Sequence, residues 1–286
     1  MKIAFLGPEG SYSHLTAQAF LETETRTADA GKAWADECIP FRNFPEVFAA
    51  VESGRVDAAA LPIENSLQGG VLQNLDLLQA SEDLYAVKEL ILRVDHRLVY
   101  KKGVKLSEIG RVYSHRQALD QCAAFLSKEM PFASLRETES TAFGVTRAME
   151  DESGKSAAIA GVHTKNLRGD FVLGEESIAD EKNNFTHFLL VKKGKNTLPA
   201  NSERVFFSTV SQHKPGSLVA LLQIIAKYGI NMTKIESRPV KNRVGDYRFF
   251  IEADCDIASA QVQEMLNAIR ENTLECKLLG AYSREQ

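Results

Sequence analysis

The chain has 286 residues, with 34 Lys and Arg against 38 Asp and Glu, and a formal net charge of −4. Hydrophobic residues make up 44% and charged residues 25%, which is typical of a globular protein and excludes disordered, collagen-like and coiled-coil chains. This balance provides no basic field for nucleic acid or an anionic membrane surface, and at ~150 residues per domain the length predicts about two domains.

The first residues and the cysteines bear on the compartment. The apolar run from Ile3 to Leu6 ends at Gly7-Pro8, whereas a secretory signal needs ~7–15 apolar residues. No stretch reaches the ~18 apolar residues that span a membrane. The four cysteines are scattered, with no Cys-x-x-Cys pair and no histidine at ligand spacing. We therefore expect a cytoplasmic protein with reduced thiols, no metal and no membrane partner.

Short apolar runs alternate with segments of helical period over about the first 190 residues. Strands are predicted at Lys2–Leu6, Cys38–Phe41, Val56–Leu61, Arg111–Tyr113, Phe132–Leu135 and Ala157–Ala160. Helices are predicted at Ser13–Leu21, Pro45–Glu52, Val71–Gln79, Gln117–Lys128 and Thr141–Glu150. The alternation favours an α/β fold with a parallel sheet. Two longer extended stretches, Leu84–Val99 and Phe171–Val191, are expected to cross between two lobes with a cleft between them.

A second domain is predicted beyond a polar segment, residues 192–202, which contains Gly and Pro and is typical of a linker. The elements predicted there are strand Arg204–Val210, helix Ser217–Tyr228, strands Asn231–Val240 and Asp246–Ala253, helix Ala258–Glu271 and strand Leu274–Ala281. This βαββαβ order is ferredoxin-like. The predicted domains are therefore residues 1–191 and 203–286.

The first motif, Gly7–Ser13, lies between a predicted strand and a predicted helix. Glycines let the backbone approach a ligand, and the free N–H groups of a helix start suit an anion. The spacing matches neither a P-loop nor a G-x-G-x-x-G motif. An ordinary tight turn between strand and helix is an equally good interpretation.

The second motif follows the strand Val56–Leu61 and contains Glu64, Asn65 and Ser66. Ligands of open α/β sheets bind beyond the carboxyl ends of strands, so these polar side chains are placed to meet one. The alternative is a loop that caps the helix predicted from Val71.

The third and fourth motifs each offer hydrogen-bonding groups. Gln121 follows Ser114 by seven residues, about two helical turns, so both can face one side of a helix. An ordinary helix cap and a surface glutamine explain this pair equally well. In an extended segment Thr186 and Phe188 share one face while His187 points to the other, which places a hydroxyl donor beside an aromatic ring.

Five motifs together resemble the prephenate dehydratase family in their order and spacing: Gly7–Ser13, Pro62–Ser66, Tyr113–Cys122, Glu139–Ala142 and Asn183–Phe188. In the second domain, Gly216–Val219 and Glu236–Pro239 resemble the two phenylalanine-binding motifs of that family's regulatory ACT domain. The resemblance covers essentially the whole chain. It implies a two-lobed, periplasmic-binding-protein-like α/β catalytic domain followed by a ferredoxin-like ACT domain.

The family's reaction converts prephenate to phenylpyruvate with loss of carbon dioxide and water, and it implies no cofactor. By resemblance, Thr186 donates a hydrogen bond to the departing hydroxyl. The resemblance assigns catalysis to Thr186, Asn65, Ser114 and Gln121, and substrate binding to Ser11, Tyr12, Glu64, Ser140, Thr141 and Phe188. The same chemistry on the transaminated substrate, arogenate, and a non-catalytic amino-acid sensor are the alternatives.

Feedback inhibition by L-phenylalanine is implied as well. The ligand is expected at Gly216, Ser217, Leu218, Val219, Asn231, Glu236, Ser237, Arg238 and Pro239. Because the family binds phenylalanine where two ACT domains pair, a homodimer or homotetramer is implied. A domain that serves dimerisation alone is the alternative. We also expect a monofunctional enzyme, since the first strand begins at Lys2 with no room before it for a chorismate mutase domain.

Three positions depart from the family pattern. His187 stands where the family has Arg, and if it faces away from Thr186 the change should matter little for chemistry. Arg116 replaces a proline in the first helical turn, where proline is tolerated rather than needed. Ser217 replaces an alanine of similar size, so we expect phenylalanine binding to be retained.

Overall fold

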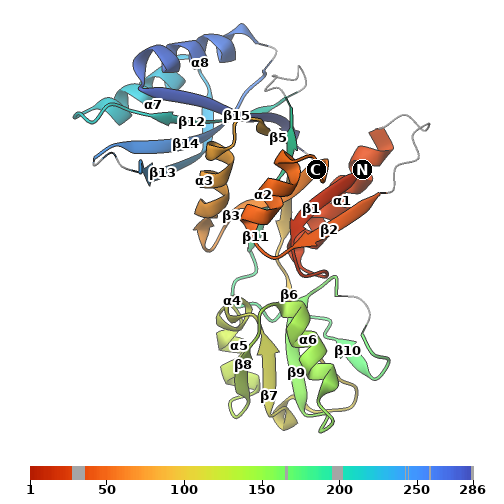
Figure 1. Cartoon of the computed structure of the whole chain (residues 1–286). Coiled ribbons are helices and arrows are strands. Elements are labelled where there is room, and N and C mark those ends of the chain that lie inside the picture. Colours follow the sequence, from red (N-terminus) through yellow and green to blue (C-terminus); the bar gives the residue numbers. More distant parts are fainter. Residues whose placement is uncertain are drawn as a thin grey trace.

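The computed structural model describes residues 1–27, 36–164, 167–194, 202–241, 243, 245–257 and 259–284. Figure 1 shows two α/β lobes and a C-terminal domain that lies against the first lobe. No helix among these residues is long and apolar enough to cross a membrane.

Lobe 1 is built on one sheet with helices on both faces. Its elements are β1 (Lys2–Leu6), α1 (Tyr12–Thr27), β2 (Glu37–Phe41), α2 (Phe44–Glu52), β3 (Ala58–Asn65), β4 (Gly69–Gly70), α3 (Leu72–Ala80), β5 (Leu84–Arg93) and β11 (Phe185–Lys193). Strands β2, β1 and β3 are parallel, and β11 runs antiparallel between β3 and β5. The late strand β11 thus returns to the centre of the first lobe.

Lobe 2 has its own sheet, in the order β10-β6-β9-β7-β8. Its elements are β6 (His96–Lys101), a 3-10 turn (Leu106–Glu108), β7 (Arg111–Ser114), α4 (Arg116–Asp120), α5 (Ala123–Glu129), β8 (Ser134–Glu137), α6 (Thr141–Glu150), β9 (Ser156–Gly161) and β10 (Phe171–Leu173). The chain crosses between the lobes twice, after β5 and before β11. The two crossings are joined where the Val94 amide donates to the Asn184 carbonyl at 2.8 Å.

The C-terminal domain has the predicted βαββαβ order. Its elements are β12 (Arg204–Val210), α7 (Ser217–Lys227), β13 (Asn231–Pro239), β14 (Tyr247–Asp254), α8 (Ala260–Asn272) and β15 (Glu275–Arg284). The sheet order is β13-β14-β12-β15, as in ferredoxin-like domains. The predicted fold class, a two-lobed α/β domain followed by a ferredoxin-like domain, is confirmed.

The sequence did not predict that the two domains share a sheet. Strand β15 pairs in parallel with β5, and Gly280 lies opposite Ala86. A Cβ atom on Gly280 would lie 2.4 Å from the Ala86 carbonyl oxygen, so this close approach requires glycine. The C-terminal domain is therefore attached to lobe 1 by backbone pairing.

Each face of the C-terminal sheet belongs to a different core. Val205 and Phe207 pack beneath α7 and α8. Phe206, Phe250 and Tyr282 point the other way and join the core that α2 and α3 form with the lobe 1 sheet. Because apolar burial stabilises by ~25 cal/mol per Å², this shared core resists separation of the domains.

One predicted helix, Gln117–Lys128, is wrong as a single element, since α4 ends at Asp120 and α5 begins at Ala123. The Asp180 carboxylate accepts from the amides of Ala124 and Phe125 and so caps α5, while the Asp180 amide donates to the Gln121 carbonyl at 2.8 Å. The expected extended stretch Phe171–Val191 contains two strands, since residues 174–184 separate β10 from β11. The predicted domain limits stay a prediction, and most of the proposed linker, residues 195–201, lies outside the described residues.

Candidate active site

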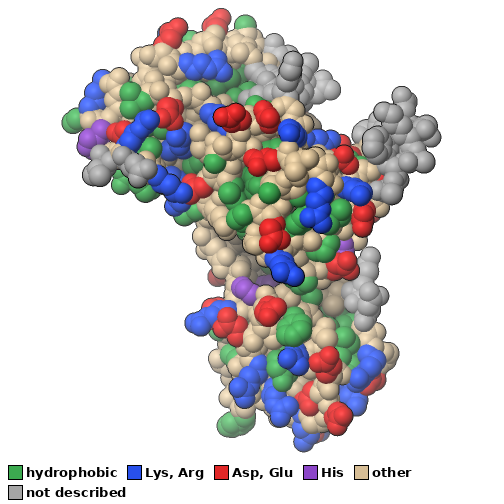
Figure 2. All heavy atoms as spheres, viewed as in Figure 1, with side chains coloured by type: hydrophobic (Ala, Val, Ile, Leu, Met, Phe, Trp, Pro, Cys, Tyr) green, Lys and Arg blue, Asp and Glu red, His purple; other side chains and the backbone are tan. Residues whose placement is uncertain are grey.

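The polar residues of two predicted motifs meet at the crossing between the lobes. Thr186, at the start of β11, lies directly opposite Asn65, at the end of β3. Both strand ends point toward lobe 2, and Figure 2 shows that the molecule narrows to a waist at this level. Inter-strand pairing thus brings together residues that are distant in the sequence.

Asn65 has a fixed amide orientation. Its Oδ1 accepts from the backbone amides of Leu67 and Gln68 at 3.1 and 3.2 Å. Its Nδ2 is therefore the donor, and it donates to the Thr186 hydroxyl oxygen at 3.0 Å and to Asn184 Oδ1 at 2.8 Å. Two backbone amides thus determine the direction of every hydrogen bond that Asn65 makes.

The direction of these hydrogen bonds also determines the direction of those that continue into lobe 2. Asn184 is almost fully buried, and because its Oδ1 accepts from Asn65, its Nδ2 donates to Gln121 Oε1 at 3.2 Å. Gln121 Oε1 also contacts His96 Nε2 at 2.8 Å, so His96 carries its proton on Nε2. Burial lowers the pKa of His96, although its hydrogen bond to Gln121 raises it in part, so the ring is neutral at pH 7.

Two hydrogen-bond donors stay free in this network. Thr186 Oγ1 accepts from Asn65, and the described residues offer no acceptor for its own proton. Gln121 uses its carbonyl oxygen twice, and no described residue accepts from its NH₂ group. The arrangement therefore presents an O–H and an N–H group, both oriented by the protein, to a ligand with an electron-rich oxygen.

Tyr12 fixes the first crossing between the lobes. Its hydroxyl donates to the Asp95 carbonyl at 2.9 Å and accepts from the Asp95 amide at 2.8 Å. Burial raises the pKa of Tyr12 to about 12, so the phenol stays protonated under ordinary conditions. Its ring also meets His163 of lobe 2 edge-on, with 4.7 Å between the ring centres. In this structure Tyr12 is therefore a hinge contact.

Two helix starts face each other across the lobes. A Cβ atom on Gly10, just before α1, would lie 3.8 Å from the Ala142 Cβ atom in the first turn of α6. Ser140 caps α6 by accepting from the Phe143 amide at 3.1 Å, and the amides of Thr141 and Ala142 have no acceptor among the described residues. Unpaired amides at a helix start suit a carboxylate. Ser11 Oγ similarly accepts from the His14 amide.

Lobe 2 has a cavity of about 720 Å³ beside this helix start. Its lining residues are Tyr113, His115, Arg136, Glu137, Thr138, Glu139, Phe143 and Arg147. The sequence motifs did not single out the two arginines, whose charge is balanced in this lining by Glu137 and Glu139.

Three of the predicted site residues lie away from Thr186. The Ser114 hydroxyl is buried and donates to the Ile159 carbonyl at 2.8 Å. Phe188 is 2% exposed in the core between α1 and the sheet. Glu64 points to the C-terminal domain, where its carboxylate pairs with Lys234 at 2.6 Å. The roles predicted for these residues stay predictions.

The sequence motifs missed two members of the network. Asn184 stood inside the fourth motif, but strand alternation alone gave it no role. His96 has no motif around it, and its only signal was a place within the extended stretch Leu84–Val99 that was expected to cross between lobes. As predicted, His187 points away from Thr186, since it contacts Glu89 at 3.0 Å.

The C-terminal domain has a cavity of about 420 Å³ between the end of β12, the start of α7 and the start of β14. Its lining residues are Ser211, Gln212, His213, Lys214, Pro215, Ser217, Leu218, Gly245, Tyr247 and Phe249. Of the predicted phenylalanine-binding residues, Ser217 and Leu218 line this cavity. Glu236 and Arg238 instead face lobe 1, where Arg238 pairs with Asp76 at 2.5 Å.

Comparison with known proteins supports both domains. A model of the prephenate dehydratase family matches residues 3–196, and a model of the ACT domain matches residues 207–271. The bifunctional chorismate mutase/prephenate dehydratase of Aquifex aeolicus is 31% identical over 285 residues, which are 99% of this chain and 74% of that protein.

Two solved structures are similar over nearly the whole chain. A prephenate dehydratase of Arthrobacter aurescens in complex with L-Phe has a TM-score of 0.83 and 28% identity, covering 99% of this chain and 90% of that one. The prephenate dehydratase of Staphylococcus aureus has a TM-score of 0.81 and 26% identity, covering 99% of this chain and 100% of that one. With a matching family model over two thirds of its length and an ACT domain after it, this chain belongs to the prephenate dehydratase family.

Proposed function

We propose that this chain converts prephenate to phenylpyruvate, and that Thr186 donates the hydrogen bond that assists departure of the ring hydroxyl. The observation that carries the assignment is the orientation of Asn65. Asn65 Nδ2 donates a hydrogen bond to the Thr186 hydroxyl oxygen, so the hydroxyl proton of Thr186 is free to be donated to a ligand.

The reaction needs little else from the protein. The ring C–O bond breaks as the C–C bond to the ring carboxylate breaks, and the electron pair released from that C–C bond completes the aromatic ring. Carbon dioxide leaves, and the departing oxygen takes a proton to become water. Aromatisation drives these steps, so an oriented donor at the leaving oxygen and fixed dipoles at the carboxylates suffice.

The substrate carries two carboxylates while the chain has a net charge of −4, so the overall charge does not attract it. Individual amides and side chains at the site must bind the carboxylates. We place the carboxylates at the facing starts of α1 and α6, with Ser11 and Tyr12 on one side and Ser140 and Thr141 on the other. Gln121 completes the polar wall near Thr186. Support comes from the free amides at the start of α6 and from the short distance between the two helix starts.

Substrate turnover tests the activity directly. Purified protein is incubated with prephenate and, separately, with arogenate, and phenylpyruvate and phenylalanine are measured as the respective products. We expect phenylpyruvate from prephenate at a rate that exceeds arogenate turnover at least tenfold. Preferred turnover of arogenate would identify an arogenate dehydratase. Phenylalanine binding without turnover of either substrate would identify an amino-acid sensor.

The C-terminal domain is proposed to bind L-phenylalanine and to inhibit the enzyme. Its cavity combines apolar surface from Leu218 and Phe249 with the start of α7, where free amides suit a carboxylate. Titration of the activity with phenylalanine tests this, and we expect inhibition at or below millimolar ligand. Unchanged activity at that concentration would overturn the proposed regulation.

A homodimer or homotetramer is proposed for the assembly. Strand β13 is at the end of the sheet order and presents Ile235, which is 46% exposed, so its unpaired edge is a surface for a second copy. Light scattering during size-exclusion chromatography measures the mass, and a monomer would contradict the proposal. A cytoplasmic location is proposed because all four cysteines are free thiols.

A further inference from the structure

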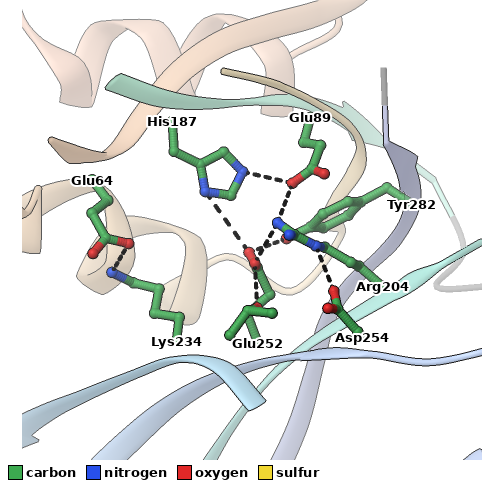
Figure 3. Close-up of polar contacts among 9 residues, drawn as sticks. Glu64, Glu89, His187, Arg204, Lys234, Glu252, Asp254 and Tyr282 are labelled. Atoms are coloured by element: carbon green, nitrogen blue, oxygen red, sulfur yellow. Dashed lines mark hydrogen bonds and ion pairs between the residues drawn. The ribbon is translucent and has the colours of Figure 1, made fainter. Parts of the chain in front are cut away.

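The C-terminal domain contacts lobe 1 at the ladder position next to the candidate active site. Along the β3–β11 ladder, Thr186 lies opposite Asn65 and His187 lies opposite Glu64. Because side chains alternate along a strand, the two pairs occupy opposite faces of the sheet. We call His187 and Glu64 the regulatory pair, since both contact the C-terminal domain, as Figure 3 shows.

Glu64 is held by strand β13. Lys234, on β13, has its ammonium group 2.6 Å from the Glu64 carboxylate, and its side chain is only 5% exposed. Two residues further along the same face, a Cβ atom on Gly70 of lobe 1 would lie 3.0 Å from the Glu236 carboxylate. This face of β13 therefore contacts lobe 1 at both ends of the loop between Asn65 and Gly69.

His187 lies against a buried ionic cluster with members from both domains. Its Nε2 lies 3.0 Å from Glu89 on β5, and its Nδ1 lies 3.9 Å from Glu252 on β14. Arg204 Nη1 joins the same two carboxylates at 2.7 and 2.8 Å, and Arg204 Nε contacts Asp254 at 3.0 Å. Glu89 and Glu252 are each only 2% exposed, so removing one partner of this cluster would leave a buried charge unpaired.

The cluster is occupied by a cation of the protein itself. Glu89, His187 and Glu252 place three possible ligand atoms within 4.8 Å of one another, a spacing that would suit a metal ion. Arg204 already bridges the two carboxylates, and although burial opposes its charge, Glu252 and Glu89 raise its pKa. The guanidinium therefore serves as the counter-ion between the domains.

Strand β14 joins this cluster to the proposed phenylalanine cavity. Phe249 lines the cavity, and Glu252 is three residues further along the same strand, about 10 Å away. Glu252 is fixed there by hydrogen bonds from Tyr282 at 2.7 Å and Thr233 at 2.8 Å. Strand β14 therefore connects the cavity to a carboxylate that lies 3.9 Å from His187.

We infer that the regulatory pair transmits phenylalanine binding to Thr186 and Asn65, through Glu252 on β14 and Lys234 on β13. This inference rests on the proposed inhibition by phenylalanine and names the contacts that carry it. His187 and Glu64 are positioning residues, because they act through their ladder neighbours. Both lobe 1 strands of the catalytic pair thus have a direct contact to the regulatory domain.

The test separates ligand binding from inhibition. Lys234→Met removes the ammonium group and keeps an unbranched side chain that is one atom shorter. Glu252→Gln removes the negative charge beside His187 and keeps one oxygen that can accept a hydrogen bond. A double variant combines the two changes. Calorimetry measures phenylalanine binding, and turnover of prephenate is measured with and without saturating phenylalanine. We expect the Kd for phenylalanine and the uninhibited kcat to stay within threefold of wild type. The residual activity at saturating phenylalanine should rise at least fivefold in the double variant, the lower bound of typical allosteric coupling.

Lys277→Met is the matched control. Lys277, on β15, also joins the two domains, since its ammonium group donates to the carbonyls of Leu78, Gln79 and Ser81 at the end of α3. That contact lies away from the ladder, so this variant should be inhibited as deeply as wild type. Equal inhibition of the double variant and wild type would overturn the inference and leave the proposed regulation intact. Wild-type enzyme that neither binds phenylalanine nor is inhibited by it would overturn both.

Discussion

Strand β11 separates two polar clusters with different chemistry. On one side of the strand, Thr186 joins a chain of neutral amides through Asn65, Asn184 and Gln121. On the other side, His187 enters a cluster of buried charges that links lobe 1 to the regulatory domain. Thr186 and His187 are adjacent in the sequence, but their side chains belong to two separate clusters that are connected here only through the backbone of β11.

The difference follows from what each side must do. A neutral network oriented by backbone amides presents donors to a dianionic substrate without adding negative charge near it. The ionic side joins the two domains at one point, where Arg204 contacts Glu89 at 2.7 Å, and loss of either partner would leave a buried charge unpaired. Chemistry and regulation can therefore be disturbed independently, and the following variants are chosen to do so.

The largest effect is expected for the hydroxyl of Thr186. Thr186→Val keeps the shape of the side chain and removes the donor, so kcat for prephenate should fall ~10²–10³-fold, the usual loss for one oriented hydrogen-bond donor. Thr186→Ser is the control and should stay within about tenfold of wild type, since the hydroxyl is retained. A valine variant within threefold of wild type would show that the hydroxyl does not act in the reaction.

Interrupting the row of hydrogen-bonded amide side chains at Asn184 should have the next largest effect on kcat. In Asn184→Asp the carboxylate still accepts from Asn65 but cannot donate to Gln121, so two acceptors face each other. We expect kcat to fall ~10–100-fold, since a buried donor or acceptor left without its partner costs ~1–3 kcal/mol and a charged one more. Asn183→Asp, at the exposed neighbouring position, is the control and should change kcat less than twofold. Equal kcat values in the two variants would show that the direction of the hydrogen bonds between these amide side chains has no role in turnover.

His96 should make the stability of this network depend on pH. Burial lowers its pKa below the unfolded value of ~6.5, so below that pH the unfolded chain binds a proton that the folded chain does not. The contribution of His96 to the free energy of unfolding is fully present above about pH 6.5. It is lost as the pH falls, by at most about 1.4 kcal/mol per pH unit. Urea unfolding at pH 7 and pH 5 should show a smaller loss for His96→Gln than for wild type. Identical losses would contradict this account.

The smallest effect on turnover is expected at His187. Its side chain points away from Thr186 into the ionic cluster, so His187→Arg, which restores the family's residue, should leave uninhibited kcat nearly unchanged. Steady-state kinetics with prephenate measures it. An increase of tenfold or more would show that this position acts on the substrate.

Much of the fold could be predicted because its determinants are local. The apolar runs that became β1, β3 and β12 and the patterns of α2 and α6 are visible in short windows of sequence. The resemblance assigned Thr186 and Asn65 to one site, but their pairing is seen only in the structure, since strand alternation gave Thr186 a face and no partner. Local pattern therefore predicted the elements, and family resemblance supplied the candidate site residues, whose roles stay predictions.

What could not be predicted depends on contacts between distant residues. Asp180 divides the helix expected at Gln117–Lys128, and nothing near Ala124 in the sequence reveals a cap that lies 56 positions away. The β5–β15 pairing and the bridge from Arg204 to Glu89 likewise join the two domains. His96 entered the network for the same reason, because only the crossing of the chain between lobes brings it to Gln121.

The two sides of β11 have separate tasks in this account, and one paired measurement tests this separation directly. Uninhibited kcat and residual activity at saturating phenylalanine are determined for wild type, Asn184→Asp and Lys234→Met. We predict that Asn184→Asp loses turnover but is inhibited by phenylalanine to the same fraction as wild type, whereas Lys234→Met keeps turnover and is inhibited less deeply. Loss of both properties together in both variants would contradict the account.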